Sequence, residues 1–127
     1  MILKGLTKVH KFRVWDLLYK KMNPVDKIDY RNRKIYPVCK EEYKRSVHFD
    51  EAVLMQLAYY DDNVVIYDKD ILRDSHSDEL VVVVYDNEDC AWKVKTETTE
   101  EWLYNWLGCD VVGNVYENPE LLERVEE

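Results

Sequence analysis

The sequence has few of the residues that build common ligand-binding loops. Only three of its 127 residues are glycine, and its three cysteines lie far apart with no Cys-x-x-Cys pair. Glycine-rich phosphate loops and dinucleotide fingerprints are therefore excluded, and a zinc site built on thiolate pairs is not expected. We expect Cys39, Cys90 and Cys109 to be reduced thiols, with Cys90 a small core residue and Cys109 also packed.

Long apolar runs are also missing. The longest is Leu80–Tyr85, far short of the roughly 20 residues that a membrane-spanning helix needs. The first residues, Met1 to Lys8, hold neither the apolar stretch nor the small-residue cleavage site of a signal peptide. We therefore expect a cytoplasmic location. Apolar residues make up 46% of the chain and aromatic residues 13%, so a folded core is expected rather than disorder.

Positive charge is scarce in the second half of the chain. Residues 1–60 hold 13 Lys and Arg against 7 Asp and Glu, whereas residues 61–127 hold 5 against 19. This asymmetry indicates either attraction between oppositely charged parts, within one chain or between copies, or an electrostatic partner for one half. A soluble protein with solvated charged faces is the simpler interpretation.

The segment 10–16 alternates polar and apolar residues and predicts a half-buried strand. Phe12 and Val14 fall on one face, and Arg13 and Trp15 on the other. Because Trp15 lies on the charged face, we expect it to cover a second apolar patch or to contact a partner. Residues 17–23 predict a hairpin turn and return strand, which Pro24 is expected to end because proline lacks the amide donor.

Short strands separated by turns are predicted in most of the remaining chain. The predicted strands cover 34–36, 47–50, 64–67, 71–72, 79–85, 90–95 and 110–116, the last with a bulge or a close approach at Gly113. The segment 52–58 fits a strand or a short helix. Turns are predicted at 61–63, 74–78 and 86–89. This spacing favours a β meander curling into a barrel.

Two short helices are predicted near the C-terminus. Thr98-x-x-Glu101 fits a capping box, and the following apolar residues repeat with helical spacing, with Gly108 as the stop; they are Trp102, Leu103, Trp106 and Leu107. We expect this helix to cover the barrel with both tryptophans buried. Asn118 followed by Pro119 predicts the start of a last helical turn.

Three stretches in the same order resemble the YopX family of phage and prophage proteins from Gram-positive bacteria. They are Lys11–Asp16 with Lys20–Met22, then Leu54–Gln56 with Ile66–Ile71, and Val111–Leu122. The resemblance implies a mainly β, curled or barrel-like, SH3-like sheet and a phage accessory protein in the host cytoplasm. It implies no catalytic residues.

The organisation that we expect is a single YopX-like domain over 1–127. Within it we allow an N-terminal hairpin lobe over 1–45 and a C-terminal β-barrel lobe over 50–127. The highly charged segment 40–45 places the boundary between the lobes near residues 40–50.

Catalytic and metal-binding patterns are weak. The densest group of potential ligands is an acidic segment comprising Asp68, Asp70, Asp74, His76, Asp78 and Glu79, which offers oxygen ligands and one imidazole for Mg²⁺ or Mn²⁺ but lacks the glycine of an EF-hand. We interpret it as a solvated loop and keep a metal-assisted hydrolase using Asp68, Asp70 and Asp74 as a third hypothesis. No cofactor, metal site or catalytic residue is assigned, and we expect a protein that is not an enzyme.

The main functional expectation is a binding protein with a macromolecular partner. A host or phage protein is the first choice, a second copy of the chain another, and a membrane is not expected. Nucleic-acid binding through residues 8–45 is the alternative, because basic and aromatic residues alternate there. The candidate contacts for either partner are Lys11, Arg13, Trp15, Lys20, Lys21, Arg31, Arg33 and Lys34.

Overall fold

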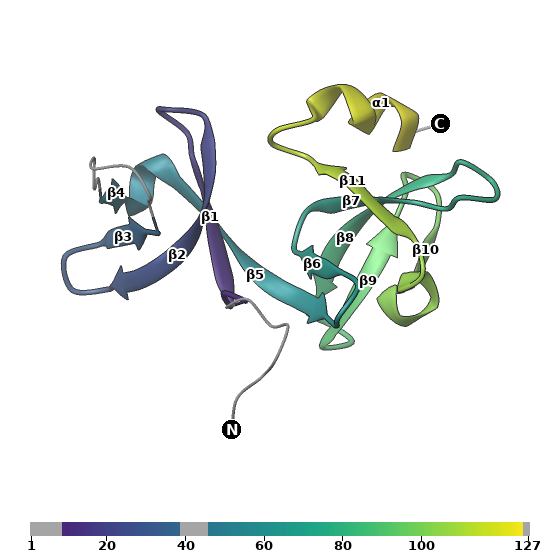
Figure 1. Ribbon diagram of the computed structural model, residues 1–127, viewed down its shortest axis with the longest axis horizontal. Helices are drawn as coiled ribbons and strands as arrows, with labels where there is room; N and C mark the ends of the chain where they lie inside the picture. The colour runs from purple at the N-terminus through teal and green to yellow at the C-terminus, as the bar shows by residue number, and fades with distance from the viewer. Residues whose placement is uncertain (1–8, 39–45, 126–127) are drawn as a thin grey trace. The chain divides into compact units, whose positions relative to one another are not determined.

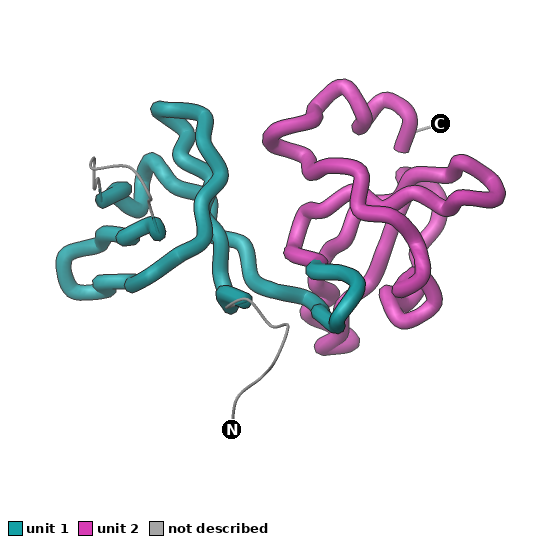
Figure 2. Tube along the Cα trace, in the orientation of Figure 1, with its two compact units in different colours: residues 1–65 teal, residues 66–127 magenta. Residues whose placement is uncertain are grey.

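The computed structural model describes residues 9–38 and 46–125. The chain divides into two compact units, residues 1–65 and 66–127 (Figure 2). The division lies further along the chain than the predicted boundary near residues 40–50, because the strand Ala52–Tyr60 pairs with the strand Phe12–Asp16 of the first unit. The charged segment 40–45 and Cys39 lie outside the described residues.

The first unit is built on antiparallel strands. They are β1 (Phe12–Asp16), β2 (Lys21–Asp29), β3 (Lys34–Pro37), β4 (Val47–His48) and β5 (Ala52–Tyr60), in the order β4-β3-β2-β1-β5, and β6 (Val65–Tyr67) follows β5 in the same sheet (Figure 1). A short 3-10 helix, Phe49–Glu51, joins β4 to β5. The predicted hairpin after β1 is confirmed, and the ambiguous segment 52–58 is a strand.

The prediction that Pro24 ends the second strand is wrong. It lies inside β2, opposite Arg13 of β1, and the register against β3 shifts between Val25 and Lys27. The Pro24 carbonyl still accepts a hydrogen bond of 2.8 Å from the Val38 amide. Each strand amide points to one neighbour only, so a proline removes a single hydrogen bond and the strand can continue past it.

The core of the first unit lies on the face of β1 that carries Val14. Val14, Val25 and Ile35 are buried there together, with Phe12 and Phe49 packed against them. The opposite face is also covered at the end of β1, because Trp15 is only 7% exposed. The predicted alternation is therefore right, but Trp15 is not available to a partner.

The second unit contains a five-stranded antiparallel sheet in the order β10-β9-β8-β7-β11. Its strands are β7 (Asp70–Arg73), β8 (Leu80–Asp86), β9 (Ala91–Lys95), β10 (Glu100–Trp102) and β11 (Asp110–Asn114). The predicted strands at 64–67, 71–72, 79–85, 90–95 and 110–116 are confirmed, as are the turns between them. Neither sheet is closed or strongly curled, so the predicted SH3-like barrel is wrong and the fold is mainly β with two antiparallel sheets.

Apolar residues are buried on both faces of the second sheet. On one face, Ile71 and Leu80 pack with Val125 of the short helix α1 (Leu122–Val125). On the opposite face, the side chains of Leu72, Val83 and Val94 are fully or almost fully buried. The β8 sequence Leu80-Val-Val-Val-Val is nearly continuous in apolar residues because both of its faces are covered.

The helix predicted from Thr98 to Leu107 does not form. Residues 100–102 are strand β10, paired with β9, and only Leu103–Trp106 is helical, as a 3-10 turn. Thr98 is not a cap: its amide and that of Thr99 donate to Thr96 Oγ1, at 3.3 and 3.0 Å, which closes the β9–β10 turn. Trp106 is buried as predicted, but Trp102 is half exposed. Pairing with β9 overrides the local helical pattern.

The C-terminal segment follows the sequence pattern more closely. The bulge at Gly113 is confirmed by the register shift between Val111 and Gly113. Pro119–Leu121 form a 3-10 helix that leads into α1, and Asn118 precedes it without a side-chain capping bond. The Asn118 Oδ1 instead accepts from the Asn114 amide at 3.2 Å, so this side chain ties the turn back to β11.

The two free cysteines among the described residues differ in burial. Cys90 is exposed in the β8–β9 turn, with a positive φ of 49°, and is not a core residue. Cys109 is partly buried, and burial raises the pKa of its thiol, with further contributions from Asp74 and Asp110. Within residues 9–38 and 46–125, no helix has the length and apolar character to span a membrane.

Candidate interaction surfaces

The turn between β1 and β2 is held by several hydrogen bonds. Buried Asp16 accepts from the amides of Leu18 and Tyr19 through Oδ1, at 2.9 and 3.0 Å. Its carbonyl accepts from the Lys20 amide at 2.8 Å, and the Leu17 amide donates to the Glu51 carbonyl at 2.9 Å. These bonds fix the backbone of the turn on both sides.

The side chains of this turn point into solvent although three of them are apolar. Leu17, Leu18 and Tyr19 are 39%, 61% and 52% exposed, and Lys20 and Lys21 follow them at the surface. We call Leu17–Lys21 the turn surface. Isolated exposed apolar residues are common, but three consecutive ones on a fixed turn are typical of a contact site.

The predicted contact residues do not form one patch. Lys20 and Lys21 lie at the start of β2, whereas Arg31 and Arg33 lie beyond its end, in the β2–β3 turn. The nine residues of β2 span roughly 30 Å at the rise of a strand. The eight candidates are therefore divided between the two ends of β2, with a third group on β1 or directly before it.

The remaining candidates differ in accessibility. Lys11 and Lys34 are exposed, at the beginnings of β1 and β3, while Arg13 is half-buried and Trp15 buried. Arg33 is already engaged: its guanidinium lies 3.3 Å from Asp50.

The β2–β3 turn also carries exposed aromatic surface. Tyr30 is 73% exposed and packs edge-on against Phe49, with ring centroids 6.0 Å apart. The guanidinium carbon of Arg33 lies 5.6 Å from the centroid of the same Phe49 ring. Arg31 is exposed beside them. This turn combines a stacking surface with positive charge, as single-stranded nucleic-acid sites do.

The acidic segment is used for turn structure. Asp70 is buried and accepts from the Tyr67 amide at 2.7 Å. Asp74 accepts from the His76 amide at 2.9 Å, and this hydrogen bond lowers the pKa of the Asp74 carboxyl. In the described part of the chain, no three His, Cys, Asp or Glu side chains are grouped so that they could hold a metal ion.

A lysine at the centre of three carboxylates lies on the second sheet. Lys93 Nζ is 2.8 Å from Asp86, 2.5 Å from Asp89 and 2.9 Å from Glu100. It also lies 4.8 Å from the centroid of the Trp102 ring. These contacts join β8, the following turn, β9 and β10 at one point, so the cluster fixes the edge of the sheet.

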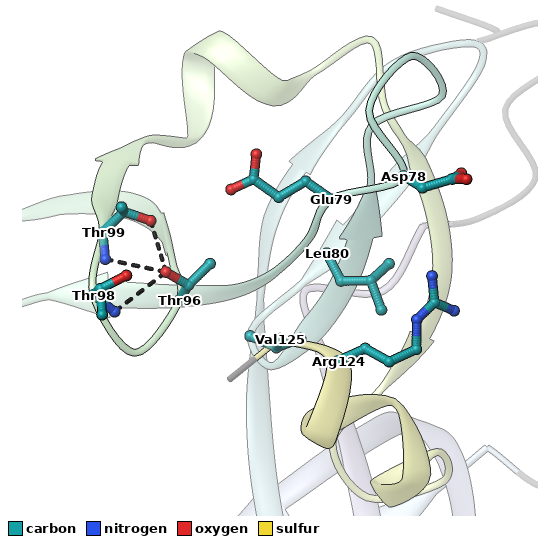
Figure 3. Close-up of a pocket in the computed structure, with 8 residues that line it drawn as sticks. All are labelled: Asp78, Glu79, Leu80, Thr96, Thr98, Thr99, Arg124 and Val125. Atoms are coloured by element: carbon teal, nitrogen blue, oxygen red, sulfur yellow. Dashed lines mark hydrogen bonds between the residues drawn. The ribbon is translucent and has the colours of Figure 1, made fainter. Parts of the chain in front are cut away.

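A cavity of about 320 Å³ opens beside the C-terminal helix of the second unit (Figure 3). Its apolar lining is Leu80 at the start of β8 and Val125 of α1, both buried. The β9–β10 turn borders it with three threonines, Thr96, Thr98 and Thr99, held together by bonds to Thr96 Oγ1.

Charged side chains of both signs border the same cavity. In Figure 3 the Glu79 carboxylate extends toward the threonine turn, whereas the Arg124 guanidinium lies on the other side of the Leu80 side chain, nearer Asp78. Across the described residues, the side chains of Asp78, Glu79 and Arg124 make no hydrogen bond or ion pair. Within residues 9–38 and 46–125, the charges at this cavity therefore have no ion-pair partner.

Sequence reasoning missed the turn surface and the cavity. The pattern of residues 17–23 predicts a hairpin turn and nothing more, but three consecutive apolar residues, Leu17-Leu18-Tyr19, are unusual in a turn and signal an exposed apolar surface. The cavity is built by segments 78–80, 96–99 and 124–125, which are far apart in sequence. No local pattern could have joined them.

Comparison with known proteins agrees with this fold. The crystal structure of protein EF1440 from Enterococcus faecalis is similar, with a TM-score of 0.57 and 22% sequence identity over 91% of this chain and 99% of that chain. At this identity the similarity establishes the fold alone. No curated protein matches the sequence. Residues 11–123 match the family model described as YopX protein, as the three sequence stretches indicate. The chain therefore belongs to the YopX protein family.

Proposed function

We propose that this YopX-family chain is a non-enzymatic interaction module, encoded by a phage or prophage, that binds a host or phage protein in the bacterial cytoplasm. The turn surface, Leu17–Lys21, is the observation that carries the proposal. It presents apolar side chains to solvent on a backbone held by Asp16 and Glu51.

The geometry of the turn favours binding in two ways. The backbone is already ordered, so little conformational entropy is lost when a partner contacts it. Fully burying an exposed leucine side chain contributes up to about 1.5–3 kcal/mol. Lys20 and Lys21 add positive charge at the edge of this apolar surface, which selects a partner with carboxylates around an apolar cleft.

Affinity capture with variants of the whole chain tests the proposal. The test variant is Leu18→Ser with Tyr19→Ser, and the matched control is Tyr104→Ser, since Tyr104 is 81% exposed in the second unit. We expect the wild-type chain and the control to retain the same host or phage protein, and the turn variant to lose it. Equal retention of the partner protein by all three chains would show that the turn surface does not bind it.

Nucleic-acid binding is the second candidate, and the β2–β3 turn supports it. Exposed Tyr30 can stack on a base while Arg31 contacts a phosphate. A gel-shift series with single-stranded DNA over increasing salt concentration tests it, with Tyr30→Ser and Arg31→Gln as variants. Salt-dependent binding that weakens in both variants would favour this candidate, and the absence of a shift at low salt would eliminate it.

A further inference from the structure

We propose that the cavity between the β9–β10 turn and α1 binds a small zwitterion, a molecule with one cationic and one anionic group joined by a short apolar chain. This site is in the second unit and is separate from the turn surface. It rests on three features of the lining: a buried apolar floor, charges of both signs, and no ion pair between those charges.

The arrangement of charges selects this chemical class. Glu79 and Arg124 lie on different sides of Leu80, so a ligand across the floor meets a carboxylate at one end and a guanidinium at the other (Figure 3). A simple amine would satisfy Glu79 but bring a positive charge toward Arg124. A simple carboxylate would have the reverse problem with Glu79 and Asp78. A molecule with both charges avoids each repulsion.

The size and the other lining groups agree with a small ligand. A volume of about 320 Å³ is at the lower end of the range for small-molecule sites. Leu80 and Val125 provide contact for a few methylene groups. The threonine hydroxyls near Glu79 can accept hydrogen bonds from an ammonium group, which has three donors.

Isothermal titration calorimetry with the whole chain tests the site. The probes are γ-aminobutyrate, δ-aminovalerate and ε-aminocaproate, whose charges are separated by chains of increasing length. We expect saturable binding below roughly 10 mM for at least one of them, because exposed charges and a small apolar floor support modest affinity. Butylamine and butyrate, with one charge each, should bind about five-fold more weakly than the best zwitterion.

Two variants and one control make the test specific. Arg124→Gln and Glu79→Gln should each weaken zwitterion binding about five-fold, and Glu123→Gln, on α1 but outside the lining, should not change it. Circular dichroism checks that the variants remain folded. The proposal is overturned if no probe saturates, if butylamine binds as tightly as the zwitterions, or if the control variant loses binding equally.

Discussion

Lys93 Nζ lies 2.8 Å from a carboxylate oxygen of Asp86, across the hairpin formed by β8 and β9. The hydrogen bond from Lys93 is the largest cause of a lowered pKa for the Asp86 carboxyl, and Asp86 is in turn the largest cause of a raised pKa for the Lys93 ammonium. The pair is therefore most stable when both groups are charged.

This pair predicts how the stability of the second unit depends on pH. The folded-state pKa of Asp86 is below its usual 3.8, so its contribution is complete above that value and is lost as the pH falls through the folded-state pKa. The folded-state pKa of Lys93 is above 10.5, so its contribution is complete below that value and is lost as the pH rises through the folded-state pKa. Thermal unfolding of the wild-type chain across pH should show losses at both extremes.

The Lys93→Met variant isolates the cluster. It leaves three carboxylates close together without their cation, so we expect a lower Tm at neutral pH and a smaller decrease in Tm, or an increase, on acidification. The milder Asp89→Asn serves as the control, because Asp86 and Glu100 still pair with Lys93. An unchanged Tm for Lys93→Met at neutral pH would show that the cluster contributes nothing to stability.

Gly113→Ala should destabilise the chain by about 1–3 kcal/mol. A Cβ at this position would lie 2.4 Å from Asn118 Oδ1, so the Asn118 side chain must move and lose its bond to the Asn114 amide. Gly108→Ala is the matched control, since nothing lies within 4 Å of a Cβ there. Urea unfolding measures both, and equal values would contradict the close approach at Gly113.

Glu101→Ala should destabilise the chain more than Glu101→Gln does. The indole Nε1 of buried Trp106 donates to Glu101 Oε2 at 2.5 Å, and a glutamine at 101 can still accept this hydrogen bond. We expect a difference of about 1 kcal/mol between the two variants, measured by urea unfolding. If they unfold at the same concentration, the indole hydrogen bond does not stabilise the 3-10 turn.

The pairing of β10 with β9 explains why the helix predicted from Thr98 to Leu107 does not form. Trp102 and Trp106 are four residues apart, which predicts a common helical face. In the structure Trp102 is the last residue of β10. Trp106 lies in the following 3-10 turn, and its indole donates a hydrogen bond to Glu101 of β10. The sequence cannot reveal that β9 offers a partner strand for 100–102, because this depends on the fold of the whole unit.

Strands and turns could be predicted more fully because their signals are local. A few neighbouring residues are enough to recognise the alternation of polar and apolar residues around Val14 and the polar turn at Asp61. The candidate site could not be read in this way. Positive charge and aromatic character in the sequence do not reveal exposure or position: Trp15 is buried, and Lys20 and Arg31 lie near opposite ends of β2.

Asp16 provides a test of the turn that leaves its exposed side chains intact. Asp16→Ala removes the acceptor for the Leu18 and Tyr19 amides and should cost about 1–2 kcal/mol of stability, whereas Asp16→Asn keeps an acceptor oxygen and should cost less. Amide hydrogen exchange should increase at residues 18–19 in Asp16→Ala. Unchanged exchange there would show that Asp16 does not hold the turn.

Photo-crosslinking from the turn surface tests the central claim most directly. The photoreactive residue p-benzoylphenylalanine is placed in the whole chain at Leu18, and in separate chains at Tyr104 and Tyr30 as comparisons, in Gram-positive host cells. The account predicts one discrete protein adduct from position 18 and none from position 104. No protein adduct from position 18, with nucleic acid captured from position 30 instead, would contradict it.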